Sequence, residues 1–219
     1  MGSTLELVAA DGHRLSAYSA EPAGRPRGFL VVLQEIFGVT RHIRDMVDAC
    51  AAAGFHAVAP ALFDRIEPNV DVAYSDVARG RTYMQAAPDD LALLDVQAAF
   101  AAAAAGAKRG VVGYCWGGTL GYLAAVQQPL DAAVCYYGAG IGRHLAARPR
   151  CPVMFHFGES DASIPPATVA AIRAAVPEGV FHVYPAGHGF NCSDRASFEP
   201  ASAGLAQQRS LEFLHRHLG

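Results

Sequence analysis

The sequence predicts an α/β fold in which helices cover both faces of a mostly parallel sheet. Short runs that are apolar throughout alternate with longer amphipathic runs along the chain, and such strands are typical of a parallel sheet buried on both faces. The 219 residues are 52% hydrophobic and 17% charged, a composition that can bury a sizeable core. The sequence has neither an internal repeat nor a dividing linker, and we therefore expect residues 1–219 to form a single domain.

The predicted strands and helices alternate in a regular order. In the first half, the predicted elements are a hairpin over 3–20 that turns at Asp11 and Gly12, strands at 27–35 and 55–63, and helices at 40–54 and 88–110. In the second half, the predicted elements are strands at 110–115, 130–138, 152–161 and 180–187, and helices at 117–129, 165–176 and 201–218. The assignments rest on apolar periodicity and on the Gly, Pro and Asp residues at the junctions.

Two of the helices carry clear end signals. The helix over 40–54 has apolar residues at helical spacing and stops at a glycine. The helix over 88–110 has acidic residues in its first turn and basic residues in its last, which suits the helix dipole, and it includes the alanine run 101–105. Between Phe63 and Asp90 the pattern is less regular, and a long excursion of this kind often shapes a site in an α/β fold.

Composition and charge exclude several classes of partner and site. The net charge is −3 and there is no basic block, which argues against nucleic acid or an anionic membrane as a partner. No apolar run approaches the roughly 20 residues of a membrane span. The N-terminus lacks the pattern of a signal peptide, so we expect a cytoplasmic protein, either a monomer or a weak dimer. Five cysteines without a CxxC pair disfavour a disulfide framework or structural zinc, and no metal or cofactor site is predicted.

One cysteine has an unusual setting. The stretch GVVGYCWGG leads from a predicted strand into a predicted helix, with Cys115 between Gly113 and Gly117. Gly-x-Cys-x-Gly at such a junction has the form of a nucleophile elbow, a tight turn that exposes the central side chain above the sheet. The N–H groups and dipole at the start of the helix favour a thiolate and an oxyanion. The alternative is a glycine-rich turn with an inert thiol. We expect inert thiols at three cysteines inside apolar segments, Cys50, Cys135 and Cys151.

Two residues downstream complete a catalytic set. An α/β-hydrolase needs a nucleophile, an acid and a histidine in that order, each just past a strand. Asp161 ends the segment PVMFHFGESD, and His188 follows the strand in VFHVYPAGHG. The order predicts an α/β-hydrolase fold with Cys115, Asp161 and His188 as its triad. Glu159 is the competing acid, and Asp161 is preferred because it opens the loop after the strand.

The other histidines are assigned to structural positions. His156 and His182 lie within predicted strands, where we expect them to be packed or hydrogen-bonded. Surface or helix-end positions are expected for His13, His42, His56, His144, His215 and His217.

A further acid ends another predicted strand. Glu35 follows the apolar run GFLVVLQ, in the loop that supplies the second oxyanion-hole amide of an α/β-hydrolase. The Ile36 N–H group would then join the Trp116 N–H group in holding an oxyanion. A carboxylate here would lie near Cys115 and could pair with its thiol. The alternative is a loop carboxylate exposed to water.

With these residues assembled, the chain resembles the dienelactone hydrolase family, the carboxymethylenebutenolidases. The resemblance rests on QEIFGVTRHIRD, GYCWGG, GESDASIP and AGHGFNC, which occur in this order over nearly the whole chain. It implies the Cys115, His188 and Asp161 triad, and it implies that Glu35 holds the resting thiol and takes its proton when substrate binds. Members of the family hydrolyse small lactones or esters, and the type substrate is an enol-lactone that bears a carboxylate.

The resemblance also implies how the substrate carboxylate is bound. The family uses an Arg and a Tyr one helical turn apart, and Arg79 and Tyr83 match that spacing, with Arg81 as a rival. The best-known members carry a second Arg four residues after the histidine. Here that position holds Cys192, and the nearest arginine is Arg195.

The sequence therefore predicts a hydrolase of small lactones or activated esters that works through a thioester on Cys115. A general carboxylesterase or thioesterase is the competing enzyme function. Outside enzymes, the competing functions are a ligand-binding module without catalysis and a redox sensor. An Asp-oriented histidine argues against both of these, because neither binding nor sensing requires one.

Overall fold

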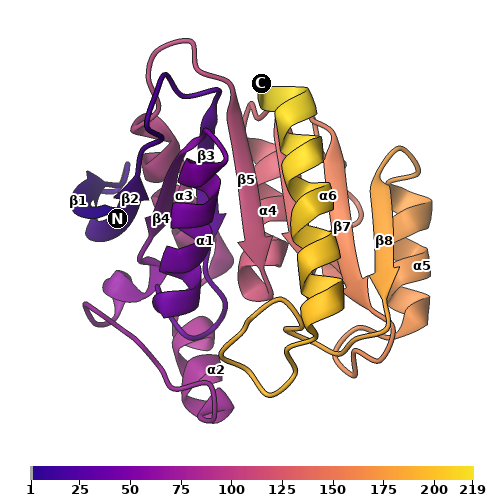
Figure 1. The fold of residues 1–219 in the computed structure, drawn as a ribbon. Coiled ribbons are helices and arrows are strands. Elements are labelled where there is room, and N and C mark those ends of the chain that lie inside the picture. Colours follow the sequence, from indigo (N-terminus) through magenta and orange to yellow (C-terminus); the bar gives the residue numbers. More distant parts are fainter. Residues whose placement is uncertain (1) are drawn as a thin grey trace.

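The strands form one eight-stranded sheet that lies between two layers of helices (Figure 1). The computed structural model describes residues 2–219. Within them, the strands are β1 Ser3–Val8, β2 Arg14–Ala20, β3 Phe29–Leu33, β4 His56–Pro60, β5 Arg109–Tyr114, β6 Ala132–Tyr136, β7 Val153–Gly158 and β8 Val180–Tyr184. The helices are α1 Arg41–Ala52, α2 Val77–Ala86, α3 Asp89–Ala101, α4 Trp116–Gln127, α5 Pro166–Ala175 and α6 Pro200–Leu218, with short 3-10 helices η1 Leu62–Arg65 and η2 Ile141–Arg143.

The sheet is mostly parallel, as the sequence predicts. Its strand order is β1-β2-β4-β3-β5-β6-β7-β8. Strands β3 to β8 pair in parallel, whereas β2 runs antiparallel to both β1 and β4. The predicted hairpin is confirmed, with its turn between β1 and β2. In the described part of the chain, no helix combines the length and apolar character that crossing a membrane requires.

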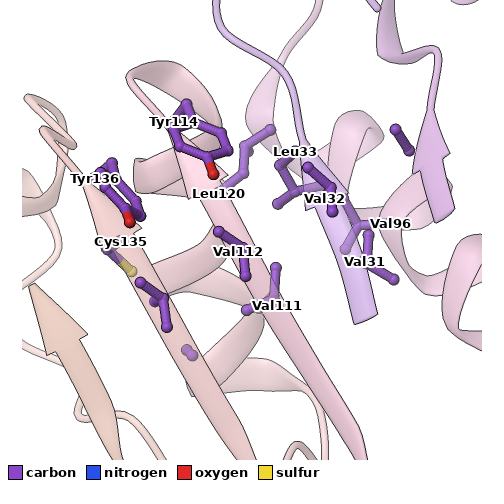
Figure 2. Close-up of a cluster of buried hydrophobic side chains, with 14 of the residues drawn as sticks. Val31, Val32, Leu33, Val96, Val111, Val112, Tyr114, Leu120, Cys135 and Tyr136 are labelled. Atoms are coloured by element: carbon purple, nitrogen blue, oxygen red, sulfur yellow. The ribbon is translucent and has the colours of Figure 1, made fainter. Parts of the chain in front are cut away.

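The central strands are buried on both faces. Helices α1 and α6 cover one face of the sheet, and α3 and α4 cover the other (Figure 1). Val31, Val32 and Leu33 of β3 lie beside Val111 and Val112 of β5 in the core, and none of these side chains is more than 3% exposed (Figure 2). Burial on both faces explains why these strands are apolar throughout instead of alternating.

Helix α3 ends earlier than the sequence predicts. The expected helix runs to residue 110, but the structure ends it at Ala101 and continues in turns through the rest of the alanine run. Those alanines are mostly exposed, and they bury too little apolar surface to hold a helix against the sheet. Gly106, with φ of 76°, turns the chain back toward β5. Lys108 is therefore outside the helix, and its Nζ donates a hydrogen bond to the carbonyl of His217 at 3.0 Å.

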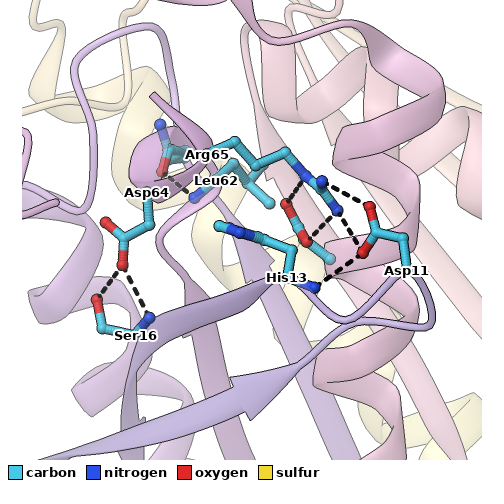
Figure 3. A network of polar contacts seen from close by, with 8 residues as sticks. Asp11, His13, Ser16, Leu62, Asp64 and Arg65 are labelled. Atoms are coloured by element: carbon cyan, nitrogen blue, oxygen red, sulfur yellow. Dashed lines mark hydrogen bonds and ion pairs between the residues drawn. The ribbon is translucent and has the colours of Figure 1, made fainter. Parts of the chain in front are cut away.

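The irregular excursion is anchored at its start by a buried ion pair. Arg65 in η1 donates to both oxygens of Asp95 in α3, at 2.7 and 2.8 Å, and also to Asp11 in the hairpin turn (Figure 3). Asp64 beside it accepts hydrogen bonds from both the amide and the hydroxyl of Ser16. Because the Asp95 side chain is fully buried, its charge depends on this two-pronged partner. The network joins the hairpin, η1 and α3 ahead of α2.

His42 lies at a helix end, one of the two settings that the sequence predicts for it, but it is buried and not at the surface. The residue belongs to the first turn of α1 and is 2% exposed. Its ring lies edge-on to the Tyr114 ring at a centroid distance of 5.8 Å. The loop that follows β8 covers this turn, and Asn191 in it contacts the sulfur of Met46 at 3.7 Å. The segment that buries His42 is therefore about 150 residues away in the sequence. It lowers the pKa of His42 to about 4, although Asp194 and Asp45 oppose the shift.

We expect His42 to make the protein less stable in mild acid. Its pKa is lower in the folded chain than the ordinary value of about 6.5, so its contribution is fully present above pH 6.5 and is lost as the pH falls toward 4. The loss amounts to about 3 kcal/mol. Urea unfolding of the parent and His42→Gln at several pH values measures it. The variant should lose less stability between pH 6.5 and 4, and equal losses would contradict the assignment.

Candidate active site

The turn that joins β5 to α4 has the tight geometry of the predicted elbow. Cys115 is its central residue and has φ of 55° and ψ of −114°, a conformation that residues other than glycine seldom adopt. A Cβ atom on Gly113 would lie 1.9 Å from the carbonyl oxygen of Gly117. A Cβ atom on Gly117 would lie 2.5 Å from the carbonyl oxygen of Gln34. Both glycines are therefore required by backbone contact.

The three residues predicted as a triad are joined by hydrogen bonds. His188 Nε2 lies 3.1 Å from Cys115 Sγ, and His188 Nδ1 lies 2.7 Å from Asp161 Oδ2. The Asp161 side chain is fully buried, and its Oδ1 also accepts the Ser163 N–H group at 2.8 Å. Glu159, the competing acid, is exposed. The three side chains follow β5, β7 and β8, whose carboxyl ends lie along the same edge of the parallel sheet.

The electrostatics of His188 favour a charged imidazole beside the sulfur. Burial lowers the pKa of His188, but hydrogen bonds to Asp161 and Cys115 outweigh it and raise the pKa to about 10. These contacts therefore favour the protonated ring. A cationic imidazolium at hydrogen-bond distance is the kind of neighbour that stabilises a thiolate.

Glu35 lies near this pair but bonds to a different partner from the one that the family resemblance implies. Its carboxyl group is 1% exposed, and Oε1 accepts a hydrogen bond from Arg195 Nη1 at 3.0 Å. Oε2 has no hydrogen-bond partner among residues 2–219. Burial raises the pKa of Glu35, and the positive charges of Arg195 and His188 lower it in part. In this structure the partner of the Cys115 sulfur is His188, so Glu35 is not paired with the thiol.

The sequence alone shows no role for Arg195. It is seven residues beyond His188, in the loop after β8, and its guanidinium stacks over the Phe37 ring at 5.5 Å. Gly189 makes room for it, because a Cβ atom there would lie 2.4 Å from Arg195 Nη1. Gly189, directly after His188, is thus the one feature of the local sequence that points to the position of Arg195. Cys192, where the family resemblance predicts an arginine, is fully buried, and burial raises the pKa of its thiol to about 11.

The loop after β3 is held against the start of α4. The Gly117 N–H group donates to the Gln34 carbonyl at 3.0 Å, which places the loop that carries Ile36 next to Cys115. Trp116 is the first residue of α4, so its N–H group has no acceptor within the helix. Its indole N–H group is fixed separately by Asp89 Oδ1 at 2.8 Å. Both predicted oxyanion-hole amides therefore belong to segments that meet at the elbow.

The Arg79 and Tyr83 pair, predicted to bind a substrate carboxylate, is bonded to a carboxylate of the chain itself. Arg79 and Tyr83 lie one turn apart on α2, with Nη2 and Oη 3.4 Å apart. The Tyr83 hydroxyl donates to Glu67 Oε2 at 2.6 Å. These three side chains line a pocket with Ile66 that none of the triad residues lines. Arg81 is exposed on the same helix.

A stack of rings connects this pocket to the elbow. Phe63 stacks on Tyr83 at a centroid distance of 5.3 Å and on Trp116 at 5.4 Å. Helix α2 also touches the loop after β3, since a Cβ atom on Gly80 would lie 2.6 Å from the carbonyl oxygen of Ile36. The predicted clamp is therefore a neighbour of the elbow, although its polar groups already have partners.

Comparison with known proteins shows the family of the chain. The model of the dienelactone hydrolase family matches residues 15–218. The carboxymethylenebutenolidase of Pseudomonas putida is 33% identical over 227 residues, which cover 96% of this chain and 94% of the relative. The chain belongs to the dienelactone hydrolase family. Like the other members, it is a hydrolase that acts on carboxylic ester bonds, lactones included, in small molecules.

Solved structures extend the likeness to three dimensions. A crystal structure from Klebsiella pneumoniae subsp. pneumoniae, provisionally described as a dienelactone hydrolase, is 31% identical with a TM-score of 0.83, and the match covers 97% of this chain and 98% of that one. A dienelactone hydrolase-like promiscuous phosphotriesterase from metagenomic libraries has a TM-score of 0.70 at 20% identity, which shows a shared fold alone. The predicted α/β-hydrolase fold is confirmed.

Two glycines of α4 provide a matched test of the elbow. Gly117→Ala should destabilise the protein by about 3 kcal/mol, because the new methyl group would overlap the carbonyl oxygens of Leu33 and Gln34. Gly121→Ala adds the same methyl group one turn later, where the nearest atoms are 3.7 Å away. It should be neutral or stabilising by up to about 1 kcal/mol through helix propensity. Urea unfolding measures both, and similar effects at the two sites would contradict the crowding argument.

Proposed function

We propose that the chain hydrolyses small lactones or activated esters through Cys115 as the nucleophile, with His188 and Asp161 as the other members of a triad. The observation that carries the proposal is the continuous line of hydrogen bonds from Asp161 through His188 to the Cys115 sulfur. The elbow conformation supports it, because strained backbone at such a position is typical of functional residues. Asp161 would orient the ring and stabilise its positive charge.

The proposed reaction has two halves. In the first, the Cys115 thiolate attacks the carbonyl carbon, a C–S bond forms and the ester C–O bond breaks. The departing oxygen takes the proton held by His188, so the ring is neutral once the alcohol or enol has left. In the second half, neutral His188 takes a proton from water as the water attacks the thioester. The C–S bond then breaks, the carboxylic acid product leaves and the thiolate is restored opposite a protonated ring.

The developing negative charge on the carbonyl oxygen would be held by two amides. The Ile36 and Trp116 N–H groups are the candidates, because the Gln34–Gly117 hydrogen bond brings their segments together beside Cys115. Trp116 also begins α4, whose dipole favours a negative charge at this end. Such donors act mainly on the transition state, where the oxygen carries its charge.

We further propose that the preferred substrates carry a carboxylate. Arg195 supports this, because its guanidinium lies beside Glu35 near the nucleophile and its side chain is 17% exposed. Arg79 with Tyr83 is the second candidate for the clamp, and Arg81 is the third. A general carboxylesterase is the competing function. One observation favours it, because the Tyr83 hydroxyl already donates its hydrogen bond to Glu67 and not to a substrate.

Replacing the proposed nucleophile tests the chemistry. Cys115→Ala should lower kcat/KM for p-nitrophenyl acetate by roughly 10³-fold or more and abolish the initial burst of p-nitrophenol. Cys151→Ala is the matched control, since it removes another partly exposed thiol and should leave the burst intact. Stopped-flow absorbance measures both. A normal burst from Cys115→Ala would rule out the thioester route.

Substrate charge tests the carboxylate clamp. A lactone with a carboxylate is compared with a neutral lactone that has the same ring, and the ratio of their kcat/KM values is measured for each variant. Arg195→Met should lower that ratio about 10- to 100-fold, as expected for the loss of a charge-assisted hydrogen bond. Arg79→Met should lower it less, because Glu67 shares its site. An unchanged ratio in both variants would favour the general carboxylesterase.

A further inference from the structure

The irregular excursion over residues 63–90 begins and ends on one side chain. Phe63, at its start, stacks on the Trp116 ring at a centroid distance of 5.4 Å, with the two planes 13° apart. Asp89, at its end, is the first residue of α3, and its Oδ1 accepts the indole N–H group of Trp116 at 2.8 Å. Two points far apart along the excursion therefore meet on Trp116, the residue that follows Cys115.

The Trp116 side chain is fixed on its apolar face and at its polar edge. The residue is 5% exposed, and an indole has a single hydrogen-bonding group, its N–H donor. Asp89 satisfies that donor, while the Phe63 ring fixes the plane of the indole. Asp90, the next residue, is exposed in the same first turn of α3. Of these two acids, Asp89 alone is bonded to the residue beside the proposed nucleophile.

The backbone next to this side chain is strained. Cys115 has φ of 55° and ψ of −114°, a conformation that persists only where the surrounding structure holds it. The carbonyl oxygen of the Cys115–Trp116 peptide accepts the Thr119 N–H group at 3.2 Å, at the long end of the range for such a bond. This bond leaves the peptide room to tilt. The anchored Trp116 side chain adds a second restraint to the same peptide.

We propose that Asp89 is a positioning residue for ester hydrolysis, which fixes the direction of the Trp116 main-chain N–H group by holding the Trp116 indole. The inference rests on the proposed function, in which this N–H group holds the oxyanion. Such a donor must point at the place where the oxygen carries its charge in the transition state, so a tilted peptide stabilises that charge less well. Asp89 acts through Trp116 and not on the substrate. The excursion would thereby support the transition state from both of its ends.

Removal of the acceptor should slow hydrolysis without weakening substrate binding. Asp89→Ala should lower kcat for p-nitrophenyl acetate about 10-fold, which is less than the loss of a whole oxyanion donor. Its KM should change less than about 2-fold, because the N–H group acts mainly on the transition state. Asp89→Asn keeps an oxygen acceptor at the same place and should restore kcat to within about 2-fold of the parent. Stopped-flow absorbance measures the burst and the steady state of each variant.

Asp90→Ala is the matched control, because it removes the other acid from the first turn of α3 and weakens the same interaction with the helix dipole. Its kcat should equal that of the parent.

Alkylation of Cys115 by iodoacetamide separates positioning from a general loss of structure. The sulfur displaces iodide from a carbon atom and no oxyanion forms, so the rate constant in Asp89→Ala should stay within about 2-fold of the parent. A loss in alkylation as large as the loss in kcat would show that Asp89 only supports the fold of the elbow, and it would overturn the proposal.

Trp116→Phe tests the route without any change at Asp89. It keeps a ring for Phe63 to stack on and loses the N–H donor, so its kcat should also fall about 10-fold. In that background, Asp89→Ala should have no further effect. An unchanged kcat in either single variant, or a full additional effect in the double variant, would overturn the positioning role. A normal burst from Cys115→Ala would overturn the proposed function instead, whereas an inactive Cys115→Ala with a normal Asp89→Ala overturns the positioning role alone.

Discussion

The candidate site depends on one close contact between backbones, where the turn from β5 into α4 meets the loop after β3. Gly113 and Gly117 lack side chains, so the turn closes on itself, and the Gly117 N–H group reaches the Gln34 carbonyl at 3.0 Å. That contact raises Cys115 above the edge of the sheet and brings the Ile36 segment next to it. The proposed nucleophile and the proposed oxyanion donors are thus positioned by the same backbone contact.

The side chains around the elbow are charged groups held in a poorly solvated interior. Asp161, Glu35 and His188 are each largely buried, and each depends on a partner at 2.7 to 3.1 Å. In such surroundings a hydrogen bond to an ion is strong, and an unpaired ion is costly. The two pairs share one arrangement. In each, the carboxylate side chain is at most 1% exposed and its cationic partner is partly exposed, at 18% for His188 and 17% for Arg195.

Internal carboxylates also bear on which substrates the site accepts. Glu35 accepts a hydrogen bond from Arg195, and Glu67 accepts one from the Tyr83 hydroxyl beside Arg79. A substrate carboxylate that bound at either of the proposed places would therefore have to displace a carboxylate of the chain. Glu67 is exposed and Glu35 is buried, so the energetic consequences differ. An exposed carboxylate is released into water at little cost, whereas a buried one needs another donor within the protein.

The sequence by itself determined the features that depend on local spacing. Apolar runs of strand length, the glycines two residues either side of Cys115, and the order of Asp161 and His188 after their strands predict the fold and the three side chains that the structure brings together. These patterns are local because each residue follows directly from the strand that carries it. Where local composition was weak, as in the alanine run after α3, the predicted helix was too long.

Only the tertiary structure decided which distant groups meet. Arg195 lies 160 residues from Glu35, the loop after β8 buries His42, and the Glu67 carboxylate meets the Tyr83 hydroxyl of α2. No periodicity encodes such contacts, because they depend on how loops pack over the carboxyl edge of the finished sheet. Burial then determines the charge state of these groups, and burial is a property of the assembled fold and not of neighbouring residues in the chain.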